Sequence, residues 1–180
     1  IRFAADGTVT APEGFEPTPA EAAALTLEIS KTKFPNRITP NVLPALPSEL
    51  LSAGADSLFW FHDINGDFLF LQHRIELENG QRAFIPYSLF DDGWRIAEPD
   101  GPLPLWGLDQ LKGRYGVVLH EGAKAARRMR ALVEGNTRED RAALKAHPFG
   151  PFLQHMAHLG WVGGAFSAYR TDWSKLRAAG

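Results

Sequence analysis

The chain has 180 residues, 44% of them hydrophobic and 22% charged, which is typical of one globular domain or two small lobes. No apolar run approaches the roughly 20 residues of a membrane span, and the first residues lack a basic flank followed by an apolar core, so neither a membrane partner nor a signal peptide is expected. Cysteine is absent, which excludes disulfides, thiolate zinc sites and cysteine nucleophiles and makes a cytoplasmic protein the expectation.

The net charge of −2 conceals a strong asymmetry along the chain. Residues 1–110 contain 7 Lys/Arg and 16 Asp/Glu, a net −9, whereas residues 111–180 contain 12 and 5, a net +7. A basic C-terminal part indicates a surface for phosphate or nucleic acid. A helix with a solvated basic face would give the same composition, and charge alone favours that simpler interpretation.

The first third of the chain predicts little regular structure. Residues 1–17 carry glycine, proline and isolated charges without a period, as in an extended lead-in. A helix is expected from about Pro19 to Ile29, because Thr18 can cap it and proline suits the first turn. Four prolines interrupt residues 31–50, which predicts a wrapping loop with at most one short helical turn.

From Ser57 the pattern changes to aromatic and branched runs typical of strands. Two such runs flank Asp63–Asp67, whose Asn-Gly pair predicts the tip of a hairpin. Residues 81–90 and 93–98 add two further runs. We therefore expect an antiparallel meander of about four strands, followed by a proline-stiffened connection.

The remaining residues predict a strand–helix–strand unit. The apolar run 116–120 indicates a strand, and 161–166 a second one. Between them three helices are expected, at residues 123–133, at 138–146 with Thr137 as the cap, and at 151–160. A strand, a crossover helix and a strand in this order imply a parallel pair, so the predicted fold class is α+β.

Several candidate sites are set aside on their spacing. Asp63–Asp67 superficially matches a calcium loop, but positions 6 and 12 counted from Asp63 are Phe68 and Arg74. His155 and His158 are three apart on a predicted helix, yet no carboxylate lies at helical spacing beside them, so a structural role is favoured over metal binding. Gly163-Gly164 lacks a phosphate-loop pattern and by itself indicates a tight turn.

Glu121 is a stronger candidate because it lies at the C-terminal end of an apolar, parallel-type strand. In open α/β sheets, ligands bind in the crevice at this edge. We expect Gly122 to permit a sharp turn into the helix that follows. A carboxylate at this place can help hold Mg²⁺ or move a proton from an attacking hydroxyl. It can equally be an acid near a helix N-terminus, which the dipole stabilises by about 0.3–1 kcal/mol, and the residues alone leave both interpretations open.

A family resemblance favours the first interpretation. The order of four segments resembles the TOPRIM region of phage- and plasmid-type DNA primases and primase-helicases. These segments are Pro104–Leu108 (PLWGL), Glu121–Ala126 (EGAKAA), Gly163-Gly164 and Thr171–Leu176 (TDWSKL). The preceding antiparallel segment is similar to the N-terminal lobe of the same catalytic core, so the resemblance covers about residues 57–176.

The resemblance implies a nucleotidyltransferase that joins nucleotides on a single-stranded DNA template. It would use Mg²⁺, or Mn²⁺, and would work beside a helicase domain or protein. Glu121 would be the catalytic and metal-site acid, and Gly122, Gly163 and Gly164 would form turns at the site. Five cations would bind phosphate or template backbone: Lys124, Arg127 and Arg128 in the helix, and Arg170 and Lys175 opposite it. The domains implied are an N-terminal extension at 1–56, an antiparallel β lobe at 57–104 and a partial TOPRIM-like α/β unit at 105–180.

The sequence departs from the family pattern in two ways. The Asp-x-Asp motif that follows Thr-Asp-Trp in the family, and supplies its principal Mg²⁺ ligands, does not occur in these 180 residues. Ala123 stands where relatives often carry a second Glu. We therefore expect a primase fragment that is inactive alone and binds Mg²⁺ weakly. The alternative is a non-catalytic module, on a TOPRIM-like scaffold, that binds nucleic acid or protein.

Overall fold

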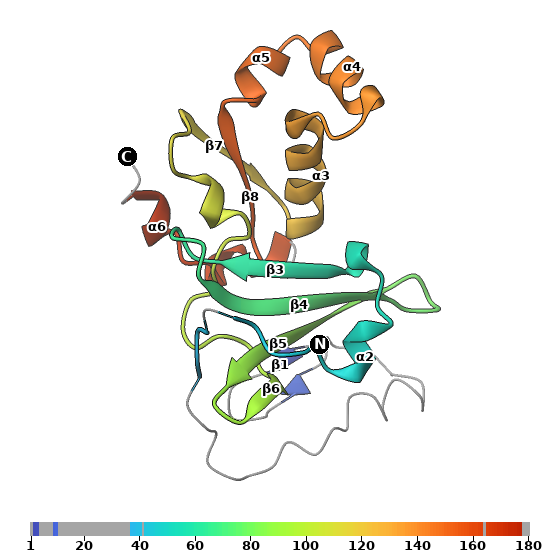
Figure 1. Cartoon of the computed structure of the whole chain (residues 1–180), viewed down its shortest axis with the longest axis vertical. Coiled ribbons are helices and arrows are strands. Elements are labelled where there is room, and N and C mark those ends of the chain that lie inside the picture. Colours follow the sequence, from blue (N-terminus) through green and yellow to red (C-terminus); the bar gives the residue numbers. More distant parts are fainter. Residues whose placement is uncertain (1, 4–8, 11–36, 41, 164, 178–180) are drawn as a thin grey trace. The chain divides into compact units, whose positions relative to one another are not determined.

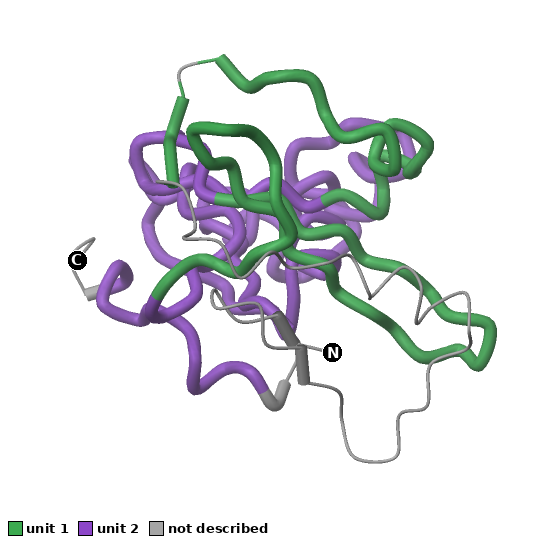
Figure 2. Tube along the Cα trace, turned by 90° about the horizontal axis from the view of Figure 1, so that it is seen from below, with its two compact units in different colours: residues 1–58, 70–100 green, residues 59–69, 101–180 purple. Residues whose placement is uncertain are grey.

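The computed structural model of the chain describes residues 2–3, 9–10, 37–40, 42–163 and 165–177. Two compact units are present, residues 1–58 with 70–100 and residues 59–69 with 101–180 (Figure 2). The predicted helix from Pro19 to Ile29 lies outside the described residues. Residues 59–69, which include most of the first strand of the predicted hairpin and its turn, belong to the second unit, whereas the sequence division groups them with residues 70–104. The boundaries at 56 and 104 stay a prediction.

The predicted antiparallel meander is confirmed. Four strands lie side by side in chain order: β3 (Leu58–His62), β4 (Phe68–Glu76), β5 (Arg82–Phe90) and β6 (Gly93–Ile96) (Figure 1). Strand β5 is buried along most of its length, which fits its apolar run. Further short elements of this part are β1 (Arg2–Phe3), β2 (Val9–Thr10), α2 (Ser48–Leu51) and the 3₁₀ turn η1 (Ala55–Ser57).

The turn between β3 and β4 is built by Asp63 and Gly66. The Asp63 carboxylate accepts hydrogen bonds from the backbone N–H groups of Asn65 at 2.7 Å and Asp67 at 2.9 Å. Gly66 has a φ of 91°, which favours glycine at this position. The residues that superficially match a calcium loop therefore form and stabilise a hairpin turn.

The second unit contains a parallel strand pair, and its first strand is the predicted one. Strand β7 (Gly116–His120) leads into α3 (Ala123–Glu134), α4 (Arg138–Ala146) and α5 (Gly150–Leu153), and the chain returns as β8 (Met156–Gly160). The two strands pair in parallel, with Gly116 opposite Met156 and His120 opposite Gly160. The Thr137 side chain caps α4 by accepting a hydrogen bond from the Asp140 N–H at 3.0 Å, as predicted.

The prediction of a helix over 151–160 and a strand over 161–166 is wrong. Helix α5 ends at Leu153, and the strand is five residues earlier than expected, at Met156–Gly160. All five residues of β8 are buried, so both of its faces are covered and the run lacks the alternation of a half-exposed strand. Residues Ala165–Arg170 form the 3₁₀ segment η3, and α6 (Ser174–Arg177) follows.

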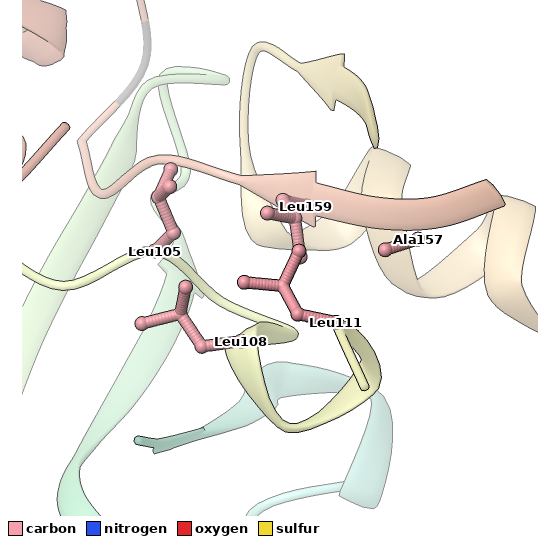
Figure 3. Packing of buried hydrophobic residues seen from close by; sticks show 5 residues of the cluster. All are labelled: Leu105, Leu108, Leu111, Ala157 and Leu159. Carbon is pink, nitrogen blue, oxygen red and sulfur yellow. The ribbon is translucent and has the colours of Figure 1, made fainter. Parts of the chain in front are cut away.

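One face of β8 packs on leucines that precede β7. Leu105, Leu108 and Leu111, from the segment around the 3₁₀ turn η2 (Leu108–Gln110), form a buried cluster with Ala157 and Leu159 (Figure 3). Partly buried side chains pack around this cluster, namely those of Ile64, Val117, Trp161, Trp173 and Leu176. This core fixes β8 against the chain segments that flank it.

None of the helices in the described part of the chain has the length and apolar character that crossing a membrane requires.

Candidate functional site

The C-terminal edge of the β7–β8 pair carries the predicted acid. His120 lies opposite Gly160, so Glu121 and Trp161 are the first residues beyond the two paired strands. The Glu121 side chain is exposed, and α3 begins two residues later at Ala123. The structure therefore places Glu121 at the strand edge expected from the sequence, next to the N-terminus of α3.

A close backbone approach holds this edge together. A Cβ atom on Gly160 would lie 2.5 Å from the carbonyl carbon and oxygen of Gly122 and 2.8 Å from the Ala123 nitrogen. Gly122 itself has extended backbone, with φ −172°, and a Cβ there would meet only the Trp161 carbonyl, at 3.9 Å. Gly160 therefore allows the β7–α3 turn to lie directly on the end of β8.

Segments far apart in the sequence meet along β8. Trp106 and Gly160 exchange backbone hydrogen bonds of 2.8 and 3.1 Å, so the Pro104–Leu108 segment lies antiparallel to the end of β8. Leu103 in turn forms a parallel bridge with Thr171. The described residues of the segments that carry the resemblance are thus gathered at one edge of one unit.

Gly107 permits the segment to turn away from β8. Its φ is +88°, and a Cβ there would meet the Gln110 side-chain nitrogen at 2.5 Å and the His158 carbonyl at 2.8 Å. A side chain at this position would be strained and would also collide with the backbone of β8. The backbone conformation and the close packing at this position thus explain why the Pro-Leu-Trp-Gly-Leu segment has a glycine there.

The three predicted cations of α3 have different surroundings. Lys124 is exposed in the first turn. Arg127 is half-buried, and its guanidinium lies 4.2 Å from the centre of the Phe59 ring, close enough for a cation–π contact. Arg128 forms an ion pair of 2.7 Å with Asp140 of α4. Lys124 is therefore the one of these three that an added phosphate meets without first breaking a described contact.

The Arg128–Asp140 pair ties α3 to α4. The Asp140 side chain is 4% exposed, whereas that of Arg128 is 67% exposed. The hydrogen bond from Arg128, together with a weaker contribution from Thr137, holds the pKa of Asp140 below its usual value. This geometry gives Arg128 a structural role, in addition to any contact with phosphate.

The remaining predicted residues lie after β8. The Arg170 carbonyl accepts a 2.6 Å hydrogen bond from the Leu103 N–H, which fixes its backbone beside the Pro-Leu-Trp-Gly-Leu segment. Lys175 is exposed, with its ammonium 4.0 Å from the Asp172 carboxylate. Gly163 adopts a φ of +82° in the turn after β8, and Gly164 lies outside the described residues.

A histidine pair lies beside Glu121 on β7 and β8. The ring nitrogens His120 Nε2 and His158 Nδ1 are 3.1 Å apart, and His158 Nε2 is 3.1 Å from the Leu153 carbonyl. A carbonyl only accepts, so His158 Nε2 carries the proton and His158 Nδ1 accepts from His120. Nδ1 of neutral His120 is then left with a lone pair.

Burial lowers the pKa of both histidines. His158 is fully buried, and the charge of Arg114 adds to the lowering while the hydrogen bond to Leu153 opposes it. For His120 the desolvation is joined by repulsion from His158. The pair is therefore held neutral at physiological pH.

The donor set at this edge does not make a Mg²⁺ site. Mg²⁺ takes carboxylate, phosphate and water oxygens in octahedral geometry. In the described residues no three His, Cys, Asp or Glu side chains are grouped so that they could hold a metal ion. Glu121 can supply one oxygen ligand, and Mg²⁺ would need its other ligands from water, from phosphate or from a further carboxylate.

One hollow in the described part of the chain is lined by helices α3, α4 and α5. Its volume is about 420 Å³, and its lining includes Glu134, Arg141 and Lys145. Glu121 is not among the residues that line this hollow.

The sequence predicts the position of Glu121, but it does not predict which side chains contact the residues around it. The His120–His158 contact joins two strands, whereas the sequence pattern assigns His158 to a helix. Arg127 rests on Phe59, which lies far earlier in the chain. No local pattern signals such contacts, although a histidine inside an otherwise apolar run, as in the segment MAHLG, is a hint of a buried partner.

Comparison with known proteins leaves the family open: no protein-family model, curated protein or solved structure matches the chain.

Proposed function

We propose that the chain is part of the catalytic core of a primase-type nucleotidyltransferase of phage or plasmid origin. The observation that carries the proposal is the place of Glu121, an exposed carboxylate at the C-terminal edge of a parallel strand pair and beside a helix N-terminus. This edge is where α/β sheets bind ligands. The motif order that resembles TOPRIM supports the same conclusion, because its segments converge on β8.

In the proposed reaction a 3′-hydroxyl attacks the α-phosphate of a nucleotide, and pyrophosphate leaves. Glu121 accepts the hydroxyl proton or orients the group that does. Lys124, in the first turn of α3, attracts the phosphates as a point charge. Mg²⁺, when bound by the complete domain, would neutralise charge on the phosphates. Single-stranded DNA and nucleotides are the proposed ligands, a helicase is the proposed neighbour, and the cytoplasm is the proposed compartment.

In this proposal the metal site is incomplete in these 180 residues, and the further acids that it needs are supplied by sequence outside them. The 180-residue chain is then expected to bind Mg²⁺ weakly and to make no primers. A primer-synthesis assay with Mg²⁺ and with Mn²⁺ tests this directly. Products from the wild-type chain that vanish in Glu121→Gln would show that the chain is a complete catalyst and would contradict this part of the proposal.

A non-catalytic module that binds nucleic acid is the second candidate. The net charge of +7 in residues 111–180 favours it, because charge alone binds phosphate without any catalytic acid. Reading the natural gene beyond codon 180 separates the two candidates. Codons for an Asp-x-Asp motif shortly after codon 180 support the primase, whereas a stop codon near Gly180 supports the non-catalytic binding module.

A further inference from the structure

The opposite edge of the β7–β8 pair carries a second set of side chains. Residues 112–115 lead into β7 and residues 152–155 lead into β8, and the two strands begin in register, with Gly116 opposite Met156. Tyr115 donates its backbone N–H to the His155 carbonyl at 3.0 Å, which extends the pairing by one step. We define the start edge as the residues Lys112, Arg114, Tyr115, Phe152 and His155.

The start edge exposes aromatic surface. The Tyr115 side chain is 85% exposed and that of Phe152 is 58% exposed. The Tyr115 and His155 rings lie 5.3 Å apart with an angle of 31° between their planes, so the histidine supports the tyrosine from one side. A large ring held in place but open to solvent is what base stacking uses.

The chain segments that carry these rings contain only positive charges, and the Asp63 carboxylate lies next to Asn65, the residue that Lys112 contacts. Residues 110–120 and 141–171 together contain five Lys/Arg and no Asp or Glu. Two of the five are in the start edge: Lys112 hydrogen-bonds to the side-chain carbonyl of Asn65 at 3.2 Å, and Arg114 to the backbone carbonyl of Gln154 at 2.8 Å. Both cations are positioned by neutral oxygens, so their charge is not cancelled in these contacts.

We propose that the start edge binds single-stranded nucleic acid, with a base stacked on Tyr115 and phosphates beside Lys112 and Arg114. A single strand fits because its base faces are open, whereas a duplex hides them. A protein partner would gain from the apolar rings but would need carboxylates to match the cations. The inference rests on the proposed function for the class of ligand, yet it uses neither Glu121 nor a metal.

Fluorescence anisotropy with a labelled oligothymidylate of roughly 20 nucleotides, longer than a typical single-strand site, tests the proposal on the 180-residue chain. Tyr115→Ala is expected to weaken binding about tenfold. Tyr115→Phe keeps the ring and should bind as wild type, whereas Tyr115→Leu keeps apolar area without a stacking face and should resemble Ala. Lys112→Gln should reduce the slope of log Kd against log salt by about 0.7.

Equal binding by wild type and Tyr115→Ala would overturn the proposal, as would full binding by Tyr115→Leu, which would indicate a protein surface. Absence of wild-type binding to both oligothymidylate and oligouridylate would also overturn it. Because Tyr115 is so exposed, its variants are expected to keep the thermal midpoint of the wild type, and a melting curve checks this. Glu139→Gln, at an exposed site on α4 that belongs to neither proposed site, should bind normally. Primer synthesis is measured separately, so a failed primase proposal and a failed start edge give different results.

Discussion

At the scale of single residues, Gly160 is restricted to glycine by the backbone of Gly122 and Ala123. We predict that Gly160→Ala lowers the free energy of unfolding by about 1–3 kcal/mol, because the new methyl group overlaps backbone that cannot rotate away. Gly122→Ala is the matched control on the other side of the contact. Its φ suits any residue and the nearest atom lies 3.9 Å away, so a change within about 0.5 kcal/mol is expected. Urea unfolding measures both, and equal losses would contradict the packing described here.

The His120–His158 pair predicts a dependence of stability on pH. Both histidines have a pKa lowered from 6.5 in the folded chain, so below about this pH the unfolded chain binds more protons than the folded one. The free energy of unfolding should therefore be highest above pH 6.5 and fall as the pH drops through it. Burial lowers the pKa of His73 in the same direction, so the pair accounts for part of the loss.

Variants of the pair isolate that part. His120→Gln removes one titrating ring while a side-chain amide can still donate to His158. We expect it to lose less stability than wild type between about pH 8 and about pH 5. Urea unfolding over this range gives the comparison, and a loss as steep as that of wild type would show that the pair does not titrate as described.

At the scale of elements, the cations of α3 differ in role: one stabilises the fold, and another is proposed to bind phosphate. Arg128 pairs with the buried Asp140, so Arg128→Gln should lower the thermal midpoint by leaving that carboxylate without its cation. Lys124 is exposed, so Lys124→Gln should leave the midpoint unchanged and weaken binding of single-stranded DNA, with a salt slope lower by about 0.7. Melting curves and anisotropy on both variants check this, and the reverse pattern would contradict it.

The elements also show what the sequence can predict. Strand β7, helix α3 and the cap of α4 follow from local signals: an apolar run, a period of 3.6 and a threonine before a helix. Strand β8 does not, because it is short, buried on both faces and joined to α5 by a Gln-His turn that contains no glycine or proline. The sequence pattern assigns residues 151–160 to one helix, whereas in the structure the His158 ring lies on a strand and is satisfied by His120 and Leu153.

In the candidate site, too, local sequence signals predict some features and not others. Glu121 could be predicted because its place depends on the end of one strand. The contacts of Arg127 with Phe59 and of Arg128 with Asp140 could not, because each depends on how distant segments pack. The sequence also offers Gly122 as the special glycine, whereas the close approach requires Gly160.

At the scale of the whole molecule, the charge asymmetry of the chain follows its two compact units only in part, because residues 59–69 and 101–110 of the acidic half also belong to the second unit. The net +7 of residues 111–180 lies within the second unit, which carries Glu121 at one edge of the β7–β8 pair and the start edge at the other. The proposed chemistry and the proposed strand binding thus fall at two ends of one small parallel sheet.

Template-dependent incorporation of nucleotides by the longest natural chain that contains these 180 residues tests the central claim most directly. Glu121→Gln should lower the rate at least about a hundredfold, as removal of a general base or metal ligand does. Glu139→Gln, the same change at an exposed site on α4, should leave the rate unchanged. Incorporation that is lost only in Glu121→Gln is the predicted result. Wild-type rates in Glu121→Gln, or no incorporation by the natural chain, would contradict the proposed function.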